Sequence, residues 1–171
     1  QMSAPDFIRQ SPLADKASGW MAVDAATLQS KDYANVFGIG DCTTTSNSKT
    51  AAAITSQAPV LVHNLARAIE GKPLDGKYLG YASCPLVIAK GDVMMAEFGY
   101  GGKLMETFSP ETGKLPLSLL GVEGFLPSRF FYFLKMQVFP YAYWNMWLQG
   151  NWYGTNGPFK PNVVPSEVAT K

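Results

Sequence analysis

The feature that most constrains this chain is a short hydrophobic run that ends in a glycine-rich turn and leads into a long helical segment. Residues 35–42 read Asn-Val-Phe-Gly-Ile-Gly-Asp-Cys, which predicts a strand whose end presents one carboxylate, Asp41. Gly38 and Gly40 allow the backbone to turn sharply and to approach a ligand closely. The pattern that follows predicts a helix over residues 49–70, with a glycine as its stop signal.

A strand, a glycine turn and a helix in this order are the setting in which many flavoproteins hold the sugar-phosphate part of FAD. Asp41 can accept hydrogen bonds from ribityl hydroxyls, next to the close approach that Gly40 permits. The amides of Thr50 and Ala51, at the helix N-terminus, are candidate donors to the flavin's pyrimidine edge. Lys49 adds a positive charge there, which would favour electron density on a reduced flavin or a quinone oxygen. The alternatives are a plain strand-to-turn junction and a solvated lysine, because short glycine motifs are weak signals.

Composition restricts the class of protein. A hydrophobic content of 47% indicates a globular chain, and a net charge of +1 argues against nucleic-acid binding. Two cysteines, Cys42 and Cys84, and the single His63 are too few for a disulfide scaffold or a zinc site, so we expect no metal site. The first residues lack the basic and apolar regions of a secretory peptide.

The order of the expected elements predicts an α/β fold, of the α+β kind within this chain. Strands are predicted at residues 78–81, 85–89, 93–98 and 104–108, and two short helical segments at 126–139 and 141–148. Glycines between several strands indicate antiparallel hairpins, and Pro140 is expected to split the helical segments. We expect a strand-helix piece of an FAD-binding dinucleotide domain at 1–75, and an antiparallel sheet with C-terminal amphipathic helices at 76–171.

A complete dinucleotide fold needs a βαβ unit with the motif G-x-G-x-x-G, which this sequence lacks. The chain is therefore interpreted as part of a larger flavoprotein. Gln1 as the first residue also suits a truncated product.

Several motifs together resemble the C-terminal part of the sulfide:quinone oxidoreductase family, in the version shared by mitochondria and many bacteria. They are residues 36–42, 48–53 with Gln57, 81–87, 96–98, 106–108 and 143–146. The resemblance extends over about residues 11–153. The Gly-Asp motif is shared by a wider group of flavoproteins, so the Ser-Cys-Pro-Leu run at 83–86 is the sharper discriminator.

The resemblance implies a flavoenzyme that oxidises hydrogen sulfide at a pair of redox cysteines and passes two electrons to FAD and then to a membrane quinone. It implies that Cys84 is one redox cysteine and that its partner lies in a missing N-terminal half. This chain should then be inactive alone. A further nucleophile, the sulfur acceptor, would collect the product.

Residue chemistry leaves two interpretations of Cys84. A reactive cysteine needs partial access and a thiolate, whereas a lone cysteine is more often a buried structural residue. The resemblance favours the reactive interpretation, and Pro85 could aim the sulfur out of the strand by biasing the backbone toward extended geometry. Cys42 is expected to pack, and no functional disulfide between Cys42 and Cys84 is expected.

Residues 125–152 are dense in aromatic side chains, with Arg129 and Lys135 among them. Two prolines and these charges argue against a spanning helix. Core packing and an interfacial amphipathic pair remain, and the resemblance favours the second. It therefore implies a membrane-associated protein, at the bacterial cytoplasmic membrane or the mitochondrial inner membrane. The expected quinone contacts are Lys49, Phe98, Phe130 and Phe133.

Other classes of protein share parts of this pattern. A type II NADH dehydrogenase would need no cysteine, and the flavoprotein subunit of flavocytochrome c sulfide dehydrogenase would need no aromatic membrane segment. A non-catalytic membrane-association module would need no reactive Cys84. In isolation the chain is expected to expose apolar surface, which could drive homo-oligomerisation.

Overall fold

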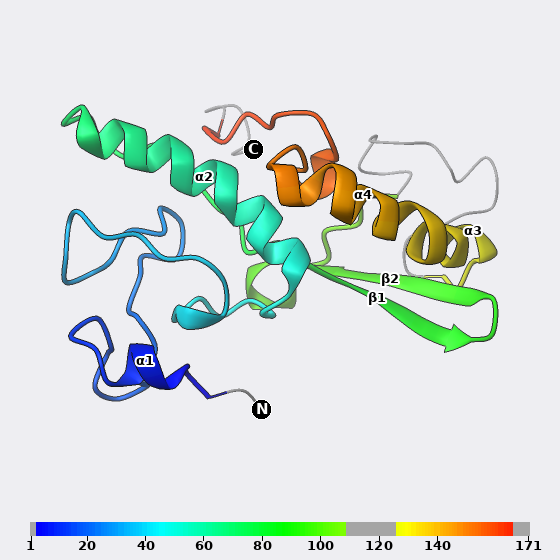
Figure 1. Cartoon of the computed structure of the whole chain (residues 1–171), viewed down its shortest axis with the longest axis horizontal. Helices are drawn as coiled ribbons and strands as arrows, with labels where there is room; N and C mark the ends of the chain where they lie inside the picture. Colours follow the sequence, from blue (N-terminus) through cyan, green and yellow to red (C-terminus); the bar gives the residue numbers. More distant parts are fainter. Residues whose placement is uncertain (1–2, 109–125, 166–171) are drawn as a thin grey trace.

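The computed structural model describes residues 3–108 and 126–165 (Figure 1). In chain order its elements are α1 (Asp6–Arg9), η1 (Gly40–Cys42), α2 (Ala51–Ile69), β1 (Ala82–Ala89), β2 (Asp92–Phe98), η2 (Tyr100–Gly102), α3 (Arg129–Phe133), η4 (Leu134–Val138), α4 (Phe139–Asn145), η5 (Trp147–Gln149) and η6 (Gly154–Asn156). Helices together with a two-stranded antiparallel sheet make the fold α+β, as predicted.

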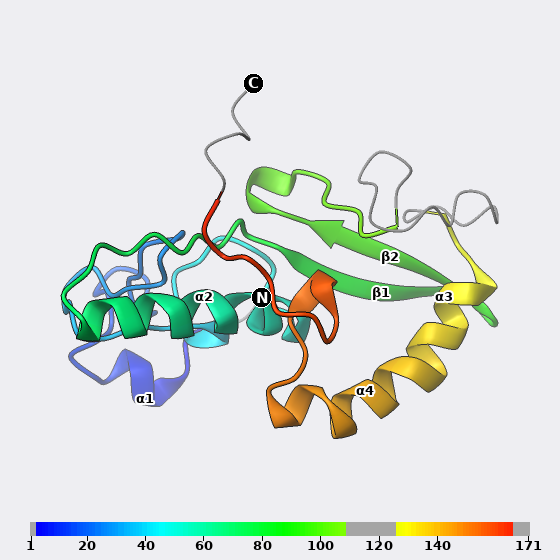
Figure 2. The same cartoon turned by 90° about the horizontal axis from the view of Figure 1, so that it is seen from above.

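The elements form two parts that meet at the start of α2. Helix α2 and the loops of the first fifty residues make one part, and the β1–β2 hairpin extends away from it (Figure 1). Helix α3 lies near the tip of the hairpin, and the helical segment runs back from there toward α2, with α4 diverging from the strands in the view from above (Figure 2). The N-terminus of α2 and the base of the hairpin are thereby brought into the same region.

Local signals define the ends of α2. Thr50 is its N-cap, with Oγ1 accepting the Ala53 N–H at 3.2 Å. The helix ends at Ile69, and Gly71 follows with φ +66°. The predicted span of 49–70 is therefore confirmed to within two residues. Its buried Val60 packs in a core cluster with Leu28, Tyr78 and Tyr81.

The strand predicted before Gly40 is wrong. Phe37 forms only an isolated bridge to Gln29, and the chain then turns through the 3-10 helix η1. A strand exists only where a partner strand pairs with it, so a strand-like pattern does not form one by itself. The turn is nevertheless in place, because the Gly38 N–H donates to the Leu28 carbonyl at 3.0 Å.

The sheet is a single antiparallel hairpin, in which Cys84 pairs with Ala96 and Ser83 pairs with Glu97. The strands predicted at 85–89 and 93–98 are confirmed within β1 and β2. Those predicted at 78–81 and 104–108 are wrong as strands: these segments flank the hairpin base, with one bridge from Phe98 to Leu104.

The C-terminal helical segment is continuous where a break was predicted. Pro140 is accommodated near the start of α4, directly after the π-helical turn η4. A proline ring meets the carbonyl four residues earlier in a regular α-helix, and a wider π turn changes that geometry. Phe131 of α3 is fully buried against Val93 and Met95 of β2, so this helix covers one face of the hairpin. Residues 109–125, including the start of the predicted aromatic segment, lie outside the described residues.

Candidate functional site

The turn before α2 is built around Gly40, whose φ of +73° is a conformation that favours glycine. Its N–H donates to Oε1 of Gln57 at 2.8 Å, and its carbonyl accepts a hydrogen bond from Thr43 Oγ1 at 2.9 Å. Gln57 is 1% exposed, so a fully buried side chain of α2 fixes this turn. The sequence motifs include Gln57, but only the structure reveals this contact.

Asp41 is exposed at the outside of the turn. Its backbone carbonyl accepts a hydrogen bond from Nε1 of Trp20 at 2.8 Å. Its carboxylate has no hydrogen-bond partner in the described part of the chain. The backbone at Asp41 is therefore anchored, while the charged group remains available to a ligand.

Lys49 turns its ammonium toward the loop. Nζ donates to the carbonyls of Thr43 and Thr45 at 2.8 and 3.2 Å and lies 5.6 Å from the centre of the Trp20 ring. Burial lowers the pKa of Lys49, although the charge of Asp41 opposes this shift. The ammonium thus stabilises the loop that leads into α2.

Of the two amide donors predicted at the start of α2, the N–H of Thr50 already has an acceptor and that of Ala51 has none within the described chain. The Thr50 N–H already donates to the Ser48 carbonyl at 3.0 Å, so Thr50 acts in the structure as the helix cap. The N–H groups of Ala51 and Ala52 have no acceptor in the described residues. Orphan donors of this kind occur at every helix N-terminus and are the groups that bind anions and polar ligand edges.

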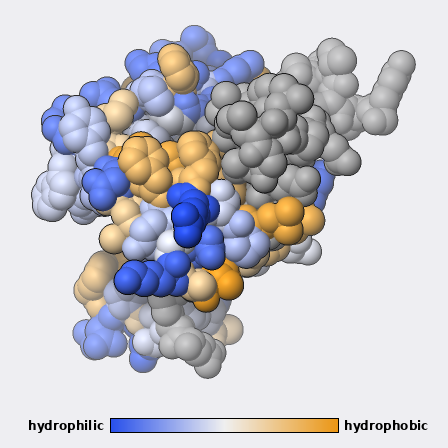
Figure 3. Space-filling view, turned by 90° about the vertical axis from the view of Figure 1, so that its right-hand side faces the viewer, coloured by the Kyte–Doolittle hydropathy of each residue, from blue (hydrophilic) through white to orange (hydrophobic). Residues whose placement is uncertain are grey.

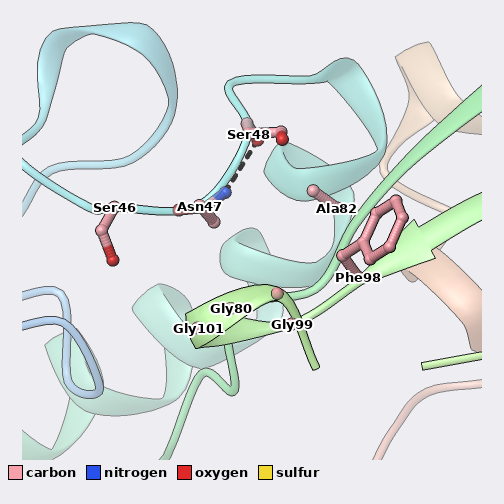
Figure 4. Close-up of a pocket in the computed structure, with 9 residues that line it drawn as sticks. Ser46, Asn47, Ser48, Gly80, Ala82, Phe98, Gly99 and Gly101 are labelled. Atoms are coloured by element: carbon pink, nitrogen blue, oxygen red, sulfur yellow. Dashed lines mark hydrogen bonds between the residues drawn. The ribbon is translucent and has the colours of Figure 1, made fainter. Parts of the chain in front are cut away.

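A cavity of about 310 Å³ lies between the loop before α2 and the base of the hairpin (Figure 4). Its lining consists of Ser46, Asn47, Ser48, Gly80, Ala82, Phe98, Gly99, Gly101 and Gly102. Four of these nine residues are glycines, so much of its wall is backbone. A Cβ on Gly101 or Gly102 would meet nothing within 4 Å. The Oδ1 of Asn47 is buried without a hydrogen-bond partner.

Cys84 is exposed and its thiol is free. Alternate residues of a strand point to the same face, so Cys84 shares a face of β1 with Ala82, which lines the cavity. The two residues are about 7 Å apart along the strand. This face of the hairpin is opposite the one that Phe131 covers, because Val93 and Met95 pair with the alternate residues Val87 and Pro85.

Cys42 lies in a different environment. It is half-buried, and its Sγ donates to the Ile39 carbonyl at 3.2 Å. Burial raises the pKa of this thiol. A protonated, hydrogen-bonded thiol is a poor nucleophile, which agrees with the packing role expected for Cys42.

The structure does not bring the three predicted aromatic contacts together. Phe98 lines the cavity at the hairpin base, whereas Phe130 packs with Phe131 near the other end, where Ser128 bridges Val93. The five residues from Val93 to Phe98 span about 16 Å of strand. Phe133 is 54% exposed on the outside of α3.

A buried polar cluster, which the sequence did not indicate, lies on the helix-covered face of the hairpin. Glu97 is 1% exposed, and its Oε1 accepts hydrogen bonds from the hydroxyls of Tyr81 and Thr107, both at 2.6 Å. Its Oε2 accepts the Thr107 N–H at 2.8 Å. Burial and the neighbouring Glu97 raise the pKa of Tyr81, which keeps this phenol a donor. The cluster fixes the hairpin base. A strand-like pattern with one acid gives no signal for such a contact.

The hairpin and the C-terminal helices expose many apolar side chains. They include Leu86, Val87 and Ile88 of β1 and Phe133, Met136, Tyr141, Tyr143, Trp144 and Leu148 of the helical segment. In the space-filling view of this end of the molecule, apolar side chains gather at the surface between polar ones (Figure 3). Within the described residues, no helix combines the length and apolar character needed to cross a bilayer.

Among residues 3–108 and 126–165, no three His, Cys, Asp or Glu side chains gather in a way that could hold a metal ion. The single His63 pairs instead with Asp75, with Nε2 2.6 Å from Oδ1. In this described part of the chain, the polar groups without a hydrogen-bond partner near the cavity include the Asp41 carboxylate and the amides of Ala51 and Ala52, and Cys84 is exposed on the adjoining strand.

Comparison with known proteins places this geometry in context. The mitochondrial sulfide:quinone oxidoreductase of Schizosaccharomyces pombe is 46% identical over 162 residues, which is 94% of this chain and 34% of that protein. The mitochondrial sulfide:quinone oxidoreductases of Dictyostelium discoideum and Mus musculus are 44% and 42% identical, over 96% and 90% of this chain. The chain spans about a third of the length of these relatives.

Family models and solved structures provide further comparisons. No family model matches the chain. A chain in the cryo-EM structure of the Tetrahymena thermophila mitochondrial ATP synthase F1Fo composite tetramer is similar, with a TM-score of 0.56 and 30% identity over 60% of this chain and 24% of that one. The resemblance to part of sulfide:quinone oxidoreductase, inferred from the sequence, is confirmed by the three relatives.

Proposed function

We propose that this chain, whose sequence matches about a third of the sulfide:quinone oxidoreductases, forms the part of such an enzyme that bears one redox cysteine and one side of the FAD site. The complete enzyme would oxidise hydrogen sulfide and reduce a membrane quinone. The observation that carries the proposal is the common hairpin face of Cys84 and the cavity at the start of α2. The proposed division is residues 1–75 for the FAD-binding piece and 76–171 for the hairpin and the quinone- and membrane-facing helices.

The residues around the cavity fit a flavin. Glycine walls leave room for a flat ring, and the buried Oδ1 of Asn47 is an acceptor in need of a donor. Ala51 and Ala52 supply unused amide donors at the positive end of the α2 dipole. When bound, FAD supplies a two-electron acceptor. The remaining tasks of binding and orientation fall to the protein.

We assign separate roles to the residues of the turn. The Asp41 carboxylate accepts hydrogen bonds from FAD hydroxyls, because it is exposed on an anchored backbone. Gly40 keeps the turn in a shape that other residues adopt only with strain. Thr50 and Lys49 act mainly by holding the start of α2, and the positive charge of Lys49 adds to the field at the cavity.

Cys84 is the proposed sulfur-carrying nucleophile, because it is exposed and free on the cavity side of the hairpin. Cys42 is not its proposed partner, since that thiol is half-buried and bound to the Ile39 carbonyl. The second cysteine would come from the remaining part of the full-length protein. A further nucleophile would accept the sulfur.

We propose that the exposed apolar side chains of the C-terminal helices contact a membrane, where quinone dissolves. Trp144 and Tyr141 are 67% and 65% exposed, and such residues favour the interface between lipid and water. The relatives are mitochondrial proteins, so the mitochondrial inner membrane is the proposed location. The test is flotation of the full-length protein with vesicles of zwitterionic and anionic lipid. Replacing both Trp144 and Tyr141 by Ser should reduce the bound fraction, and unchanged binding would contradict this contact.

The decisive experiment is the visible spectrum of the full-length parent. We expect a flavin band that bleaches on addition of sulfide and returns on addition of a soluble quinone. A band that bleaches with NADH but not with sulfide would favour a type II NADH dehydrogenase instead. Recovery with a haem protein but not with quinone would favour the flavocytochrome c reaction. A full-length protein without bound flavin would favour a non-catalytic membrane module.

A further inference from the structure

The backbone next to Cys84 is held by a residue far away in the sequence. Nζ of Lys135 donates to the Pro85 carbonyl at 2.6 Å, across fifty residues of chain. Pro85 follows Cys84 directly, so the anchor acts one residue from the thiol. Within residues 3–108 and 126–165, this is the only side-chain hydrogen bond between the C-terminal helical segment and β1.

The position of Lys135 on its helix is unusual. It lies in the π turn η4, and it is half-buried while Met136 and Gln137 beside it are exposed. π turns are rare, and they occur often at functional sites. The neighbouring contacts of the helix on the hairpin are apolar, through Phe131. A half-buried ammonium requires an acceptor, and the Pro85 carbonyl supplies it.

Pro85 differs from its neighbours in β1 in how its backbone can be held. Its carbonyl accepts from Lys135, and its ring nitrogen carries no N–H, so Lys135 supplies the hydrogen bond that holds this backbone unit. Lys135 approaches on the face that Phe131 covers, which leaves the Cys84 face of the hairpin open. A hydrogen bond from the helix-covered face can therefore hold the backbone beside Cys84 while the thiol on the opposite face stays accessible.

We propose that Lys135 is a positioning residue for Cys84: its bond to the Pro85 carbonyl sets the backbone that presents the thiol to the cavity. The catalytic consequence rests on the proposed role of Cys84 in sulfide oxidation. Displacement of a reacting group by about 1 Å can reduce a rate by two orders of magnitude. Loss of this anchor, with a displacement of about half that size, should therefore lower the rate by about tenfold.

The test uses the full-length enzyme with its flavin and compares three variants. Lys135→Met keeps the length of the side chain and removes the donor, and Lys135→Arg keeps a donor. Lys90→Met removes an exposed lysine from the turn of the same hairpin and serves as the matched control. The measurements are the rate of sulfide-dependent flavin bleaching, the rate of Cys84 alkylation by iodoacetamide in the chemically reduced enzyme, and the thermal midpoint.

We expect Lys135→Met to slow bleaching by about tenfold and to change the alkylation rate at least threefold. We expect Lys135→Arg to restore both rates to within about twofold, and Lys90→Met to match the wild type. Wild-type rates in Lys135→Met would overturn the proposal. Equal losses in the Met and Arg variants, with equally lowered thermal midpoints, would also overturn it, because they would indicate general packing.

If Lys135→Met does not fold, Lys135→Gln gives the same test, since its shorter amide keeps a polar group at this half-buried position but cannot reach Pro85. The alkylation rate also separates this proposal from the proposed function. A wild-type enzyme that does not bleach with sulfide would contradict the function. The alkylation rates of the three variants would still decide whether Lys135 positions the thiol.

Discussion

The turn before α2 and the β1–β2 hairpin differ in what their buried polar side chains bind. In the turn, side chains bind backbone: Gln57 binds the Gly40 N–H, and Lys49 binds two carbonyls. At the hairpin base, the carboxylate of Glu97 binds two side-chain hydroxyls besides one backbone N–H, and the outer parts of the hairpin leave apolar residues exposed. Each region nevertheless leaves one functional group free, which is the Asp41 carboxylate in the turn and the Cys84 thiol in the hairpin. The difference suggests that the turn shapes a binding surface, whereas the hairpin carries the reactive atom.

The largest expected effect concerns the hairpin, which carries the proposed nucleophile Cys84. Cys84→Ser in the full-length enzyme should slow sulfide-dependent flavin bleaching by about 10³-fold or more, because a hydroxyl cannot replace a thiolate nucleophile. The flavin content should remain unchanged, and Cys42→Ser is the matched control with near wild-type rates. Bleaching at the wild-type rate in Cys84→Ser would remove the hairpin from the chemistry and favour a membrane-association module.

The next effect concerns what holds the hairpin. Glu97→Ala leaves the donors of Tyr81 and Thr107 without an acceptor and should cost about 2–4 kcal/mol of the free energy of unfolding. Glu97→Gln should cost about 1 kcal/mol or less, because both hydroxyls can turn to accept from the amide while its oxygen accepts the Thr107 N–H. Urea unfolding of the full-length protein measures both values. Equal losses in the two variants would mean that the charge, and not the hydrogen bonding, is what the site requires.

A smaller effect is expected in the turn. Gly40→Ala forces a side chain into a left-handed conformation and should cost about 1–2 kcal/mol. The new Cβ would also lie 3.3 Å from Ile54. We expect a matching loss of FAD affinity, measured by flavin release during dialysis. Gly91→Ala, at φ +89° in the hairpin turn with open space around it, carries similar strain far from the turn and should leave FAD affinity unchanged.

The smallest effect compares the two thiols. An acid with a raised pKa has less of its anion at a given pH, so Cys42 should be alkylated more slowly than the exposed Cys84 near pH 8. The midpoint of the pH profile for Cys42 should lie above its ordinary value of 9.0. Peptide mapping after iodoacetamide treatment measures both sites, and the urea-unfolded chain should show similar rates at both. Faster labelling of the native Cys42 would contradict its packing role.

The sequence predicted the parts of the molecule that depend on local signals. A threonine cap and a terminal glycine define α2, and the glycine at 91 defines the hairpin turn, so both were predicted nearly at their observed bounds. The strand before Gly40 was not predictable, because pairing depends on distant segments. The π turn before Pro140 was missed for a similar reason: packing of Phe131 on the hairpin allows the helix to continue past a proline.

The residues of the candidate site also separate into those indicated by local sequence and those found only in the structure. Asp41, Gly40 and Cys84 were found from motif and resemblance, and their roles remain predictions. Gln57, Trp20, Glu97 and Lys135 act through contacts that span 16 to 50 residues of sequence. No local pattern indicates such partners. The placement of Lys49 shows the limit most clearly, since its position at the start of a helix did not reveal that its ammonium faces the loop carbonyls.

The backbone wall of the cavity has a consequence for mutagenesis. Gly80, Gly99, Gly101, Gly102 and Ala82 contribute almost no side chain that a truncation could remove. Alanine scanning, which identifies a site by deleting atoms, would therefore report little from this wall. Substitutions that enlarge these residues one at a time would detect the cavity instead, because its space exists where side chains are absent.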